Sequence, residues 1–318
     1  MSFCKIYDVD VIANARTVGS MIVVAEYAQF FADTVHEKSN GAITVELYPS
    51  SSLGNTADCL EGLSLGICNI VYESIGNLAS LTSLANIEAA PYLYSGTDHW
   101  RAVWEGEVGQ GILQQMGDDC GMVIMGAGLQ GIRMMCSNKR IETPADVAGF
   151  KLRVPTIPIY LDTWTWLGAT PTPLGGSEVF TAIQQGTVEG QENPISECWN
   201  YGFYDVNPYW IKSNHVYSQD CFFMDKTFFD GLPADIQELA AKAADEASSW
   251  RNEQMVEFEA EVEQKALDAG VTIVDVDVQE FIDAFDGFMQ SEFPDLVDWA
   301  DQIAAMADTA AADPAEAA

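Results

Sequence analysis

The sequence predicts an α/β protein made of two lobes, and three observations support this. The chain has 318 residues, about twice the length of a common domain. Hydrophobic residues make up 48% of it, which is enough to build a large core. Segments with strand and helix patterns alternate along the chain, as in layered α/β proteins with a largely parallel sheet.

The alternation is clearest in the first half of the chain. A helix stop, Asn40-Gly41, follows the first expected helix, and Thr97 or Asp98 would cap the third. The expected strands cover residues 5–13, 43–48, 67–72 and 122–126, and the expected helices cover residues 21–38, 56–65 and 97–116.

A second unit begins near Ile132. No repeat or long linker precedes it, so strands are expected to pass between the units. The expected strands cover residues 132–136, 151–154 and 188–193, a helix starts at 143–146, and further helices cover 157–167 and 178–185. The resulting division places residues 1–130 and 219–250 in the first lobe and residues 131–218 and 251–318 in the second.

Residues 233–269 form the most informative segment. It begins with Pro, ends before Gly270 and contains no internal Gly or Pro. As one helix it would reach roughly 54 Å, which exceeds a lobe width of roughly 30 Å. We therefore expect a helix over residues 234–267 that braces both lobes, with two helices and an unmarked break as the alternative.

The charge of the chain excludes some functions. It carries 48 acidic and 14 basic residues, a formal net charge of -34, so nucleic-acid binding is nearly excluded. No apolar run reaches the 18 residues of a membrane-spanning helix. Residues 1–10 do not resemble a signal peptide, so the protein is either intracellular or exported with its signal removed.

The cysteines do not indicate a metal site. None of the seven has CxxC spacing, so neither zinc nor an iron–sulfur cluster is expected, and buried thiols are favoured over a disulfide framework. They are Cys4, Cys59, Cys68, Cys120, Cys136, Cys198 and Cys221.

The sequence contains no catalytic constellation and no cofactor loop. It lacks a GxSxG elbow, a Walker loop and an HExxH helix. Residues 126–131 match GxGxxG, but a strand-like stretch follows them instead of the helix that binds a pyrophosphate, so a glycine-rich crossing between lobes is the better interpretation. His215 is expected to be a satisfied core residue. The chain is therefore not expected to be an enzyme.

Two of the six arginines lie inside expected strands. Arg133 and Arg153 must each be paired or face a wet cleft, because an unpaired buried charge is costly. An internal ion pair is one possibility, since acidic partners are abundant. The other is a guanidinium fork that binds a ligand carboxylate by two hydrogen bonds.

Four strings resemble the substrate-binding proteins of tripartite ATP-independent periplasmic (TRAP) transporters, in the order and spacing of that family. The resemblance covers about residues 20–275. It implies a two-lobed periplasmic-binding-protein fold that closes around an organic acid, a TRAP membrane permease as partner and a periplasmic location, and we expect a monomer. The strings are FADTVHEKSNGAITVELYPSSSLGN at 31–55, DVAGFKLRVP at 146–155, LGATPTPLGGSEVFTAIQQGTVEGQENP at 167–194 and SNHVYSQ at 213–219.

The resemblance also implies four ligand-binding residues. Arg153 in KLRVP matches the principal carboxylate-binding arginine of the family, and Arg133 matches a second arginine of the sialic-acid-binding and related members. Asn193 in GQENP matches the asparagine that supports the ligand carboxylate. Glu73 in VYES matches a polar cleft position on the first lobe.

Two departures from the family pattern concern the ligand. Gly175-Gly176 stand where the sialic-acid binders carry an aromatic residue, so room is expected near that turn, and residues 14–24 differ from the usual ligand-contacting loop. The expected site has two arginines and only one acidic residue, Glu73, which favours an anionic ligand. A hydroxyl-bearing sugar acid suits Glu73 better than a ligand with a second carboxylate, because that carboxylate would face the charge of Glu73. A C4-dicarboxylate, a keto acid or a zwitterion is the alternative. A binding protein of an ATP-dependent transporter and a doubly wound enzyme are the rival classes.

Overall fold

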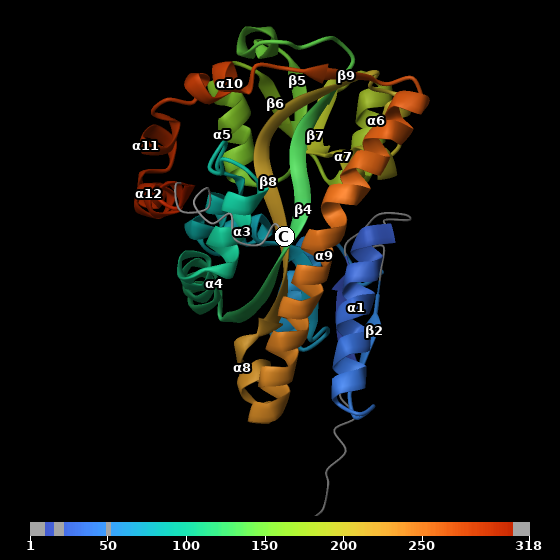
Figure 1. The fold of residues 1–318 in the computed structure, drawn as a ribbon, viewed down its shortest axis with the longest axis vertical. Helices are drawn as coiled ribbons and strands as arrows, with labels where there is room; N and C mark the ends of the chain where they lie inside the picture. Colours follow the sequence, from blue (N-terminus) through green and yellow to red (C-terminus); the bar gives the residue numbers. More distant parts are fainter. Residues whose placement is uncertain (1–9, 16–21, 49–51, 308–318) are drawn as a thin grey trace, which may run out of the picture. The chain divides into compact units, whose positions relative to one another are not determined.

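The computed structural model describes residues 10–15, 22–48 and 52–307 (Figure 1). These residues form two compact units of α/β structure. The first unit draws on Met1–Ser74, Leu113–Leu129 and Asp220–Met255, and the second on Ile75–Ile112, Gln130–Gln219 and Val256–Ala318. Strands β4 and β8 and helix α9 each contribute to both units, so strands do pass from one unit to the other.

The first unit is a sheet covered by helices. Its strands lie in the order β2-β1-β3-β8, and β1 is parallel to both of its neighbours whereas β8 is antiparallel to β3. Tyr27 and Phe31 of α1 pack with Ala243 and Ala247 of α9 in one apolar core. Its elements are β1 (Asp10–Ala15), α1 (Ile22–Lys38), β2 (Thr44–Leu47), α2 (Thr56–Leu65), β3 (Ile70–Ser74) and α8 (Lys226–Asp230).

The second unit has strands in the order β4-β7-β5-β6, with β9 parallel to β8. Strand β7 is antiparallel to β4 and parallel to β5. The strands are β4 (Met122–Ser137), β5 (Lys151–Val154), β6 (Thr170–Pro173), β7 (Gly190–Pro194), β8 (Tyr209–Asp225) and β9 (Thr272–Asp275). The helices are α3 (Thr97–Glu105), α4 (Glu107–Cys120, shared with the first unit), α5 (Pro158–Trp166), α6 (Val179–Gln184), α7 (Ile195–Asn200), α10 (Val278–Ala284), α11 (Phe288–Glu292) and α12 (Val297–Ala304).

Two apolar cores cover opposite faces of the second unit's sheet. Met135, Leu152 and Val154 belong to the core on the α5 and α10 side. Met134 and Cys136 belong to the core on the α6 and α7 side. Because side chains alternate along a strand, this packing determines the face to which each polar residue between them points.

Helix α9 (Ala234–Asp268) is a single helix of 35 residues, as the sequence predicts (Figure 1). Its first part lies in the first unit, where Ala243 and Ala247 are fully buried. Its last part lies in the second unit, where Val262 and Ala266 are buried in the α6 and α7 core. Small residues at these positions let the helix pack closely in each unit.

Three predictions differ from the structure. The helix expected over residues 97–116 is divided into α3 and α4 at Gly106, whose backbone is extended. The helix start at residues 143–146 yields only a single 3₁₀ turn, Pro144–Val147. Residues 75–112, assigned by sequence to the first lobe, lie within the second unit, because Ala89 and Ala90 pack into the α5 and α10 core.

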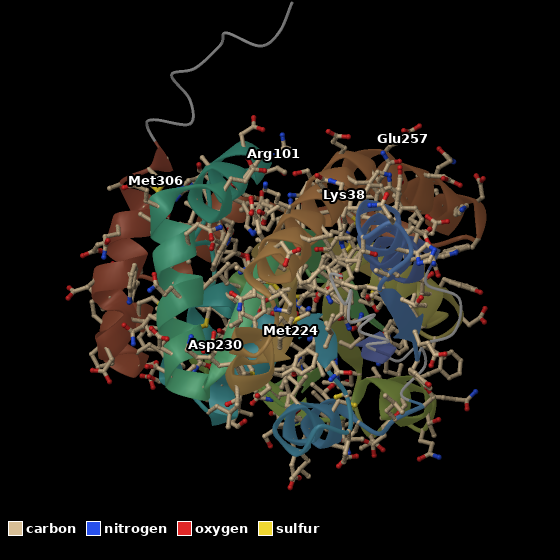
Figure 2. All side chains as sticks on the ribbon, turned by 90° about the horizontal axis from the view of Figure 1, so that it is seen from below. Lys38, Arg101, Met224, Asp230, Glu257 and Met306 are labelled. Atoms are coloured by element: carbon tan, nitrogen blue, oxygen red, sulfur yellow. The ribbon has the colours of Figure 1, made fainter. Side chains whose placement is uncertain are left out.

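Acidic residues outnumber basic residues 48 to 14. Figure 2 shows oxygen-tipped side chains projecting outward, consistent with the net charge of -34. Lys38 of α1 is one of the few exposed cations, and it pairs with Glu246 within the first unit. No helix in the described part of the chain is both long and apolar enough to cross a membrane.

Candidate functional site

Three of the four predicted ligand-binding residues lie on neighbouring strands of the second unit. Arg133 is on β4, Asn193 on β7 and Arg153 on β5, and β7 lies between the other two strands. Glu73 is on β3 in the first unit and is described separately. The strand register therefore places two cationic groups and one amide, from positions far apart in the sequence, on three adjacent strands.

Arg153 shares one face of the sheet with Gln191 and Asn193. Leu152 and Val154 point into the α5 and α10 core, so Arg153 points to the opposite face. Its register partner on β7 is Gln191, and Asn193 follows two residues later on the same side. Arg153 is 5% exposed, and the Nε and Nη2 of its guanidinium donate to the Leu174 carbonyl at 3.0 and 2.6 Å. The Leu174 carbonyl thus holds one edge of the guanidinium in a defined orientation.

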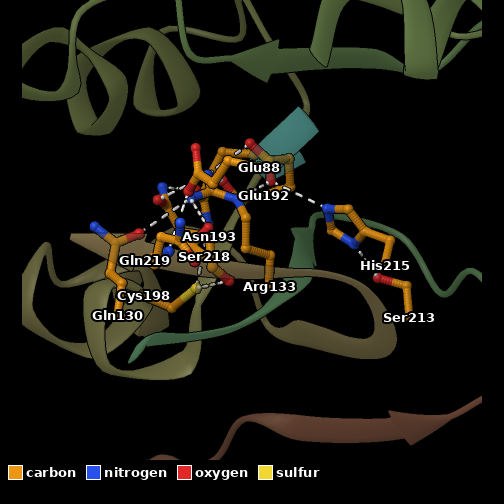
Figure 3. A network of polar contacts seen from close by, with 11 residues as sticks. Glu88, Gln130, Arg133, Glu192, Asn193, Cys198, Ser213, His215, Ser218 and Gln219 are labelled. Carbon is orange, nitrogen blue, oxygen red and sulfur yellow. Dashed lines mark hydrogen bonds and ion pairs between the residues drawn. The ribbon is translucent and has the colours of Figure 1, made fainter. Parts of the chain in front are cut away.

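Arg133 forms the internal ion pair that the sequence analysis left open. Its Nε and Nη2 lie 2.6 and 2.8 Å from the two carboxylate oxygens of Glu192, a bidentate geometry (Figure 3). The guanidinium carbon is 4.8 Å from the centre of the Tyr160 ring. Burial alone would lower the pKa of Arg133, but Glu192 outweighs it, so the pKa is raised and the group stays charged.

His215 completes this buried network and is a satisfied core residue, as predicted. Burial lowers its pKa, so the ring is neutral near pH 7. Its Nε2 lies 3.1 Å from Glu192 and its Nδ1 lies 2.9 Å from the Ser213 hydroxyl. A carboxylate only accepts, so Nε2 carries the proton and Nδ1 accepts from Ser213. Burial would raise the pKa of Glu192, but Arg133 and His215 keep it lowered.

Asn193 connects the Arg133 network to the face of Arg153. Arg133 Nη2 donates to Asn193 Oδ1 at 3.0 Å (Figure 3). Because an arginine only donates, the amide oxygen must face it, and the amide nitrogen points away. That nitrogen carries two hydrogens and donates one of them to Gln191 Oε1 at 2.6 Å. Arg133 therefore determines which way the Asn193 amide points.

Glu73 is buried within the first unit. Its carboxylate accepts hydrogen bonds from the Thr56 hydroxyl and from the Ser74 backbone N–H, both at 3.0 Å. Of the unusual loop at residues 14–24, residues 16–21 lie outside the described part of the chain. Its expected contact with a ligand remains a prediction.

The sequence alone does not indicate that Tyr201, which follows α7, lies against Gly176. A Cβ built on Gly176 would lie 2.5 Å from the Tyr201 hydroxyl. The space that the double glycine was expected to leave next to Gly176 is therefore occupied by an aromatic residue from another element. Only a pattern linking positions 176 and 201 could have indicated this.

The chain is similar to known solute-binding proteins. The family model described as bacterial extracellular solute-binding protein, family 7, matches residues 15–294. A solute-binding protein of Roseobacter denitrificans is 34% identical over 253 residues, which are 79% of this chain and 77% of that protein. A crystal structure of this Roseobacter TRAP periplasmic solute-binding protein, with bound L-galactonate, has a TM-score of 0.85 at 28% identity and covers 92% of this chain and 98% of that one.

Two further relatives differ in what they bind. A TRAP periplasmic solute-binding protein from Ochrobacterium anthropi, crystallised with L-fuconate, is 30% identical, with a TM-score of 0.84 and coverage of 94% of this chain and 99% of that one. The C4-dicarboxylate-binding periplasmic protein of Rhodobacter capsulatus is 30% identical over 244 residues, which are 76% of this chain and 73% of that protein.

Proposed function

The chain belongs to bacterial extracellular solute-binding protein family 7, and on that premise we propose that its ligand is a sugar acid bound through its carboxylate. Proteins of this family are solute receptors of TRAP transporters, not enzymes. Two properties of this chain are therefore proposed: the groups that bind the acid and the acid that they favour.

The orientation of the Asn193 amide is the observation that carries the proposal. Arg133 holds the amide oxygen of Asn193. The second amide N–H of Asn193 is therefore directed, as a hydrogen-bond donor, toward the face of the sheet that also carries Arg153. Arg153 anchors the ligand carboxylate by charge-assisted hydrogen bonds, and Asn193 donates to it. Arg133 acts through Asn193 as a positioning residue, because Glu192 already occupies its bidentate edge.

The preference for a sugar acid has two supports. The Roseobacter and Ochrobacterium relatives carry L-galactonate and L-fuconate in their structures. Glu73, proposed as a further ligand-contacting residue, would accept from a hydroxyl group but would repel a second carboxylate. Similarity to the C4-dicarboxylate-binding protein of Rhodobacter makes a C4-dicarboxylate the second candidate ligand of this chain.

The proposal extends to location and assembly. The receptor works in the periplasm as a monomer and delivers its ligand to the membrane permease of a TRAP transporter. Ligand binding shifts the population toward the form that the permease recognises. Light scattering of the purified protein with and without ligand tests the monomer, and a dimer in both states would contradict it.

A ligand panel tests the substrate class. Thermal unfolding is measured with L-galactonate, L-fuconate, succinate and ectoine, followed by calorimetric titration of each compound that raises the melting temperature. We expect a sugar acid to bind, to stabilise the protein and to be recovered unchanged. Micromolar binding of succinate or ectoine with no binding of any sugar acid would contradict the substrate class and leave the family assignment intact.

Replacement of Arg153 by lysine tests the anchor. Arg153→Lys keeps the charge but loses the planar fork, so we expect affinity for the bound acid to fall more than about tenfold. The matched control is Arg140→Lys in the same unit, because the Arg140 side chain is 51% exposed and pairs only with Glu142 among the contacts described. A folded Arg153→Lys protein with unchanged affinity would remove Arg153 from the site.

A further inference from the structure

Two buried cysteines meet at strand β7 of the second unit. Cys136 on β4 is the register partner of Gln191, and Gln191 Nε2 donates to the Cys198 sulfur of α7 at 3.3 Å. Both cysteines are fully buried in the α6 and α7 core. Both cysteines are thus placed beside Gln191, Cys136 by strand register and Cys198 by a hydrogen bond. The fold therefore brings together two thiols that are 62 residues apart in the printed sequence.

The Cys198 thiol is connected to the proposed ligand donor. Its thiol donates to the Asn193 carbonyl at 3.6 Å (Figure 3). Its sulfur also accepts from the Gln191 amide. Gln191 in turn accepts from the Asn193 amide nitrogen at 2.6 Å. Cys198 thus helps hold both the side chain and the backbone that position Asn193.

We propose that Cys136 and Cys198 form a disulfide when the chain folds under oxidising conditions, and that this crosslink weakens ligand binding by withdrawing Cys198 from Gln191 and Asn193. The effect on binding rests on the proposed role of Asn193. Disulfides persist in extracytoplasmic compartments, where proteins of this family work. The structure shows Cys136 and Cys198 in the reduced form, as thiols.

The reaction is a thiol–disulfide exchange with a small or protein disulfide as oxidant. One cysteine thiolate attacks the oxidant and forms a mixed disulfide, and the other thiolate then displaces the leaving thiol. The Cys136–Cys198 S–S bond forms, the two cysteines lose two protons and two electrons, and the oxidant becomes two thiols. Burial raises the pKa of Cys136 well above its usual value, so exchange occurs before the core of the second unit closes.

The first unit supplies a matched control. Cys68 donates to the Cys59 carbonyl at 3.4 Å, so these two cysteines are also neighbours. They lie on α2 and just before β3, and both are in the first unit, whereas Asn193 is in the second. Loss of this pair should leave any effect that acts through β7 unchanged.

The experiment compares two refolded forms of the full chain. Protein is refolded from denaturant with dithiothreitol or with a mixture of reduced and oxidised glutathione. The crosslink is mapped by mass spectrometry after alkylation of free thiols, and affinity for L-galactonate, or for the tightest sugar acid of the panel, is measured by calorimetry. Cys136→Ala, Cys198→Ala and Cys59→Ala are treated in the same way.

We expect the Cys136–Cys198 peptide only in the oxidised form, with affinity reduced about three- to tenfold, the effect of losing one orienting hydrogen bond. Cys136→Ala should bind equally well after both treatments, and Cys59→Ala should behave like the parent chain. Cys198→Ala should bind more weakly after both treatments. Absence of the crosslink, or equal affinity of both forms, overturns the proposal while the proposed function stands. If no sugar acid binds even the reduced form, the proposed function is wrong, and so is the proposed effect on affinity. The mass-spectrometric map still shows whether the Cys136–Cys198 crosslink forms.

Discussion

At the scale of single residues, Arg133 shows why a buried cation in a strand has more than one interpretation. Sequence places a charge on β4 but does not say whether its partner is a ligand or a side chain. The structure pairs it with Glu192, and removing one member of such a buried pair is strongly destabilising. Loss of binding in an Arg133 variant would therefore not by itself show ligand contact.

A prediction at the same scale concerns Gly176. In Gly176→Ala the new Cβ would lie 2.5 Å from the Tyr201 hydroxyl, so the ring must shift. We expect a loss of about 1–3 kcal/mol in the free energy of unfolding. Tyr201→Phe removes the clashing oxygen, so the same alanine should cost less in that background. Urea unfolding of both single variants and the double variant checks this, and an equal cost in both backgrounds would contradict it.

At the scale of elements, α9 owes its length to an uninterrupted run without Gly or Pro. Ala247 is fully buried in the middle of its first part. Ala247→Pro removes the bond to the Ala243 carbonyl and places a ring against it, so we expect a cost of about 3 kcal/mol or more. Ala234→Pro is the control, because proline is tolerated at the first helical position. Equal losses of unfolding free energy in both variants would contradict a continuous helix.

The last part of α9 also contains a pH-sensitive carboxyl. Burial, with a contribution from Glu263, raises the pKa of Glu259 to about 7, although the Ile132 N–H donates to it and acts in the opposite direction. A raised pKa means that the folded state binds the proton more tightly, so this stabilisation is present below the ordinary pKa of a glutamate and is lost as pH rises through about 7.

Glu259→Gln should therefore alter the pH dependence of stability. Glutamine keeps an oxygen acceptor for Ile132 but cannot ionise. We expect the variant to be more stable than the parent chain at pH 8.5, by up to about 3 kcal/mol, and the difference to shrink toward pH 5. Urea unfolding at both pH values measures it. Parallel pH profiles of the two proteins would show that Glu259 does not titrate as described.

At the scale of the whole molecule, the net charge of -34 dominates the electrostatics. Mutual repulsion of surface carboxylates opposes the compact state, and salt screens it. The screening length falls from about 30 Å at 0.01 M salt to about 10 Å at 0.1 M. The stability of the protein should therefore depend on ionic strength over this range.

When sodium chloride increases from 0.01 to 0.3 M, we expect the melting temperature to rise, by about 1–2 °C for each kcal/mol of stability gained. Sucrose of equal osmolality at 0.01 M salt separates screening from solvent exclusion. A melting temperature that stays constant or falls with salt would mean that repulsion between carboxylates is not a significant term.

The sequence by itself determined the elements with strong local signals. Helix α2 and strand β5 have the predicted bounds, and α9 is continuous, because caps, periodicity and helix breakers act over a few neighbouring residues. There were exceptions: the helix expected over residues 97–116 is interrupted at Gly106, and the helix start at residues 143–146 yields only a 3₁₀ turn. The family strings imply Arg153 and Asn193 as ligand-binding residues, and that assignment stays a prediction.

Only the tertiary structure decided what those side chains contact. The pairing of Arg133 with Glu192 spans 59 positions, and the placement of Tyr201 against Gly176 depends on how α7 packs. Neither follows from a local pattern, because strand register and helix packing are set by burial of the whole apolar core. For the same reason the meeting of Cys136 with Cys198 is invisible in their spacing and follows only from the position of β7 beside β4.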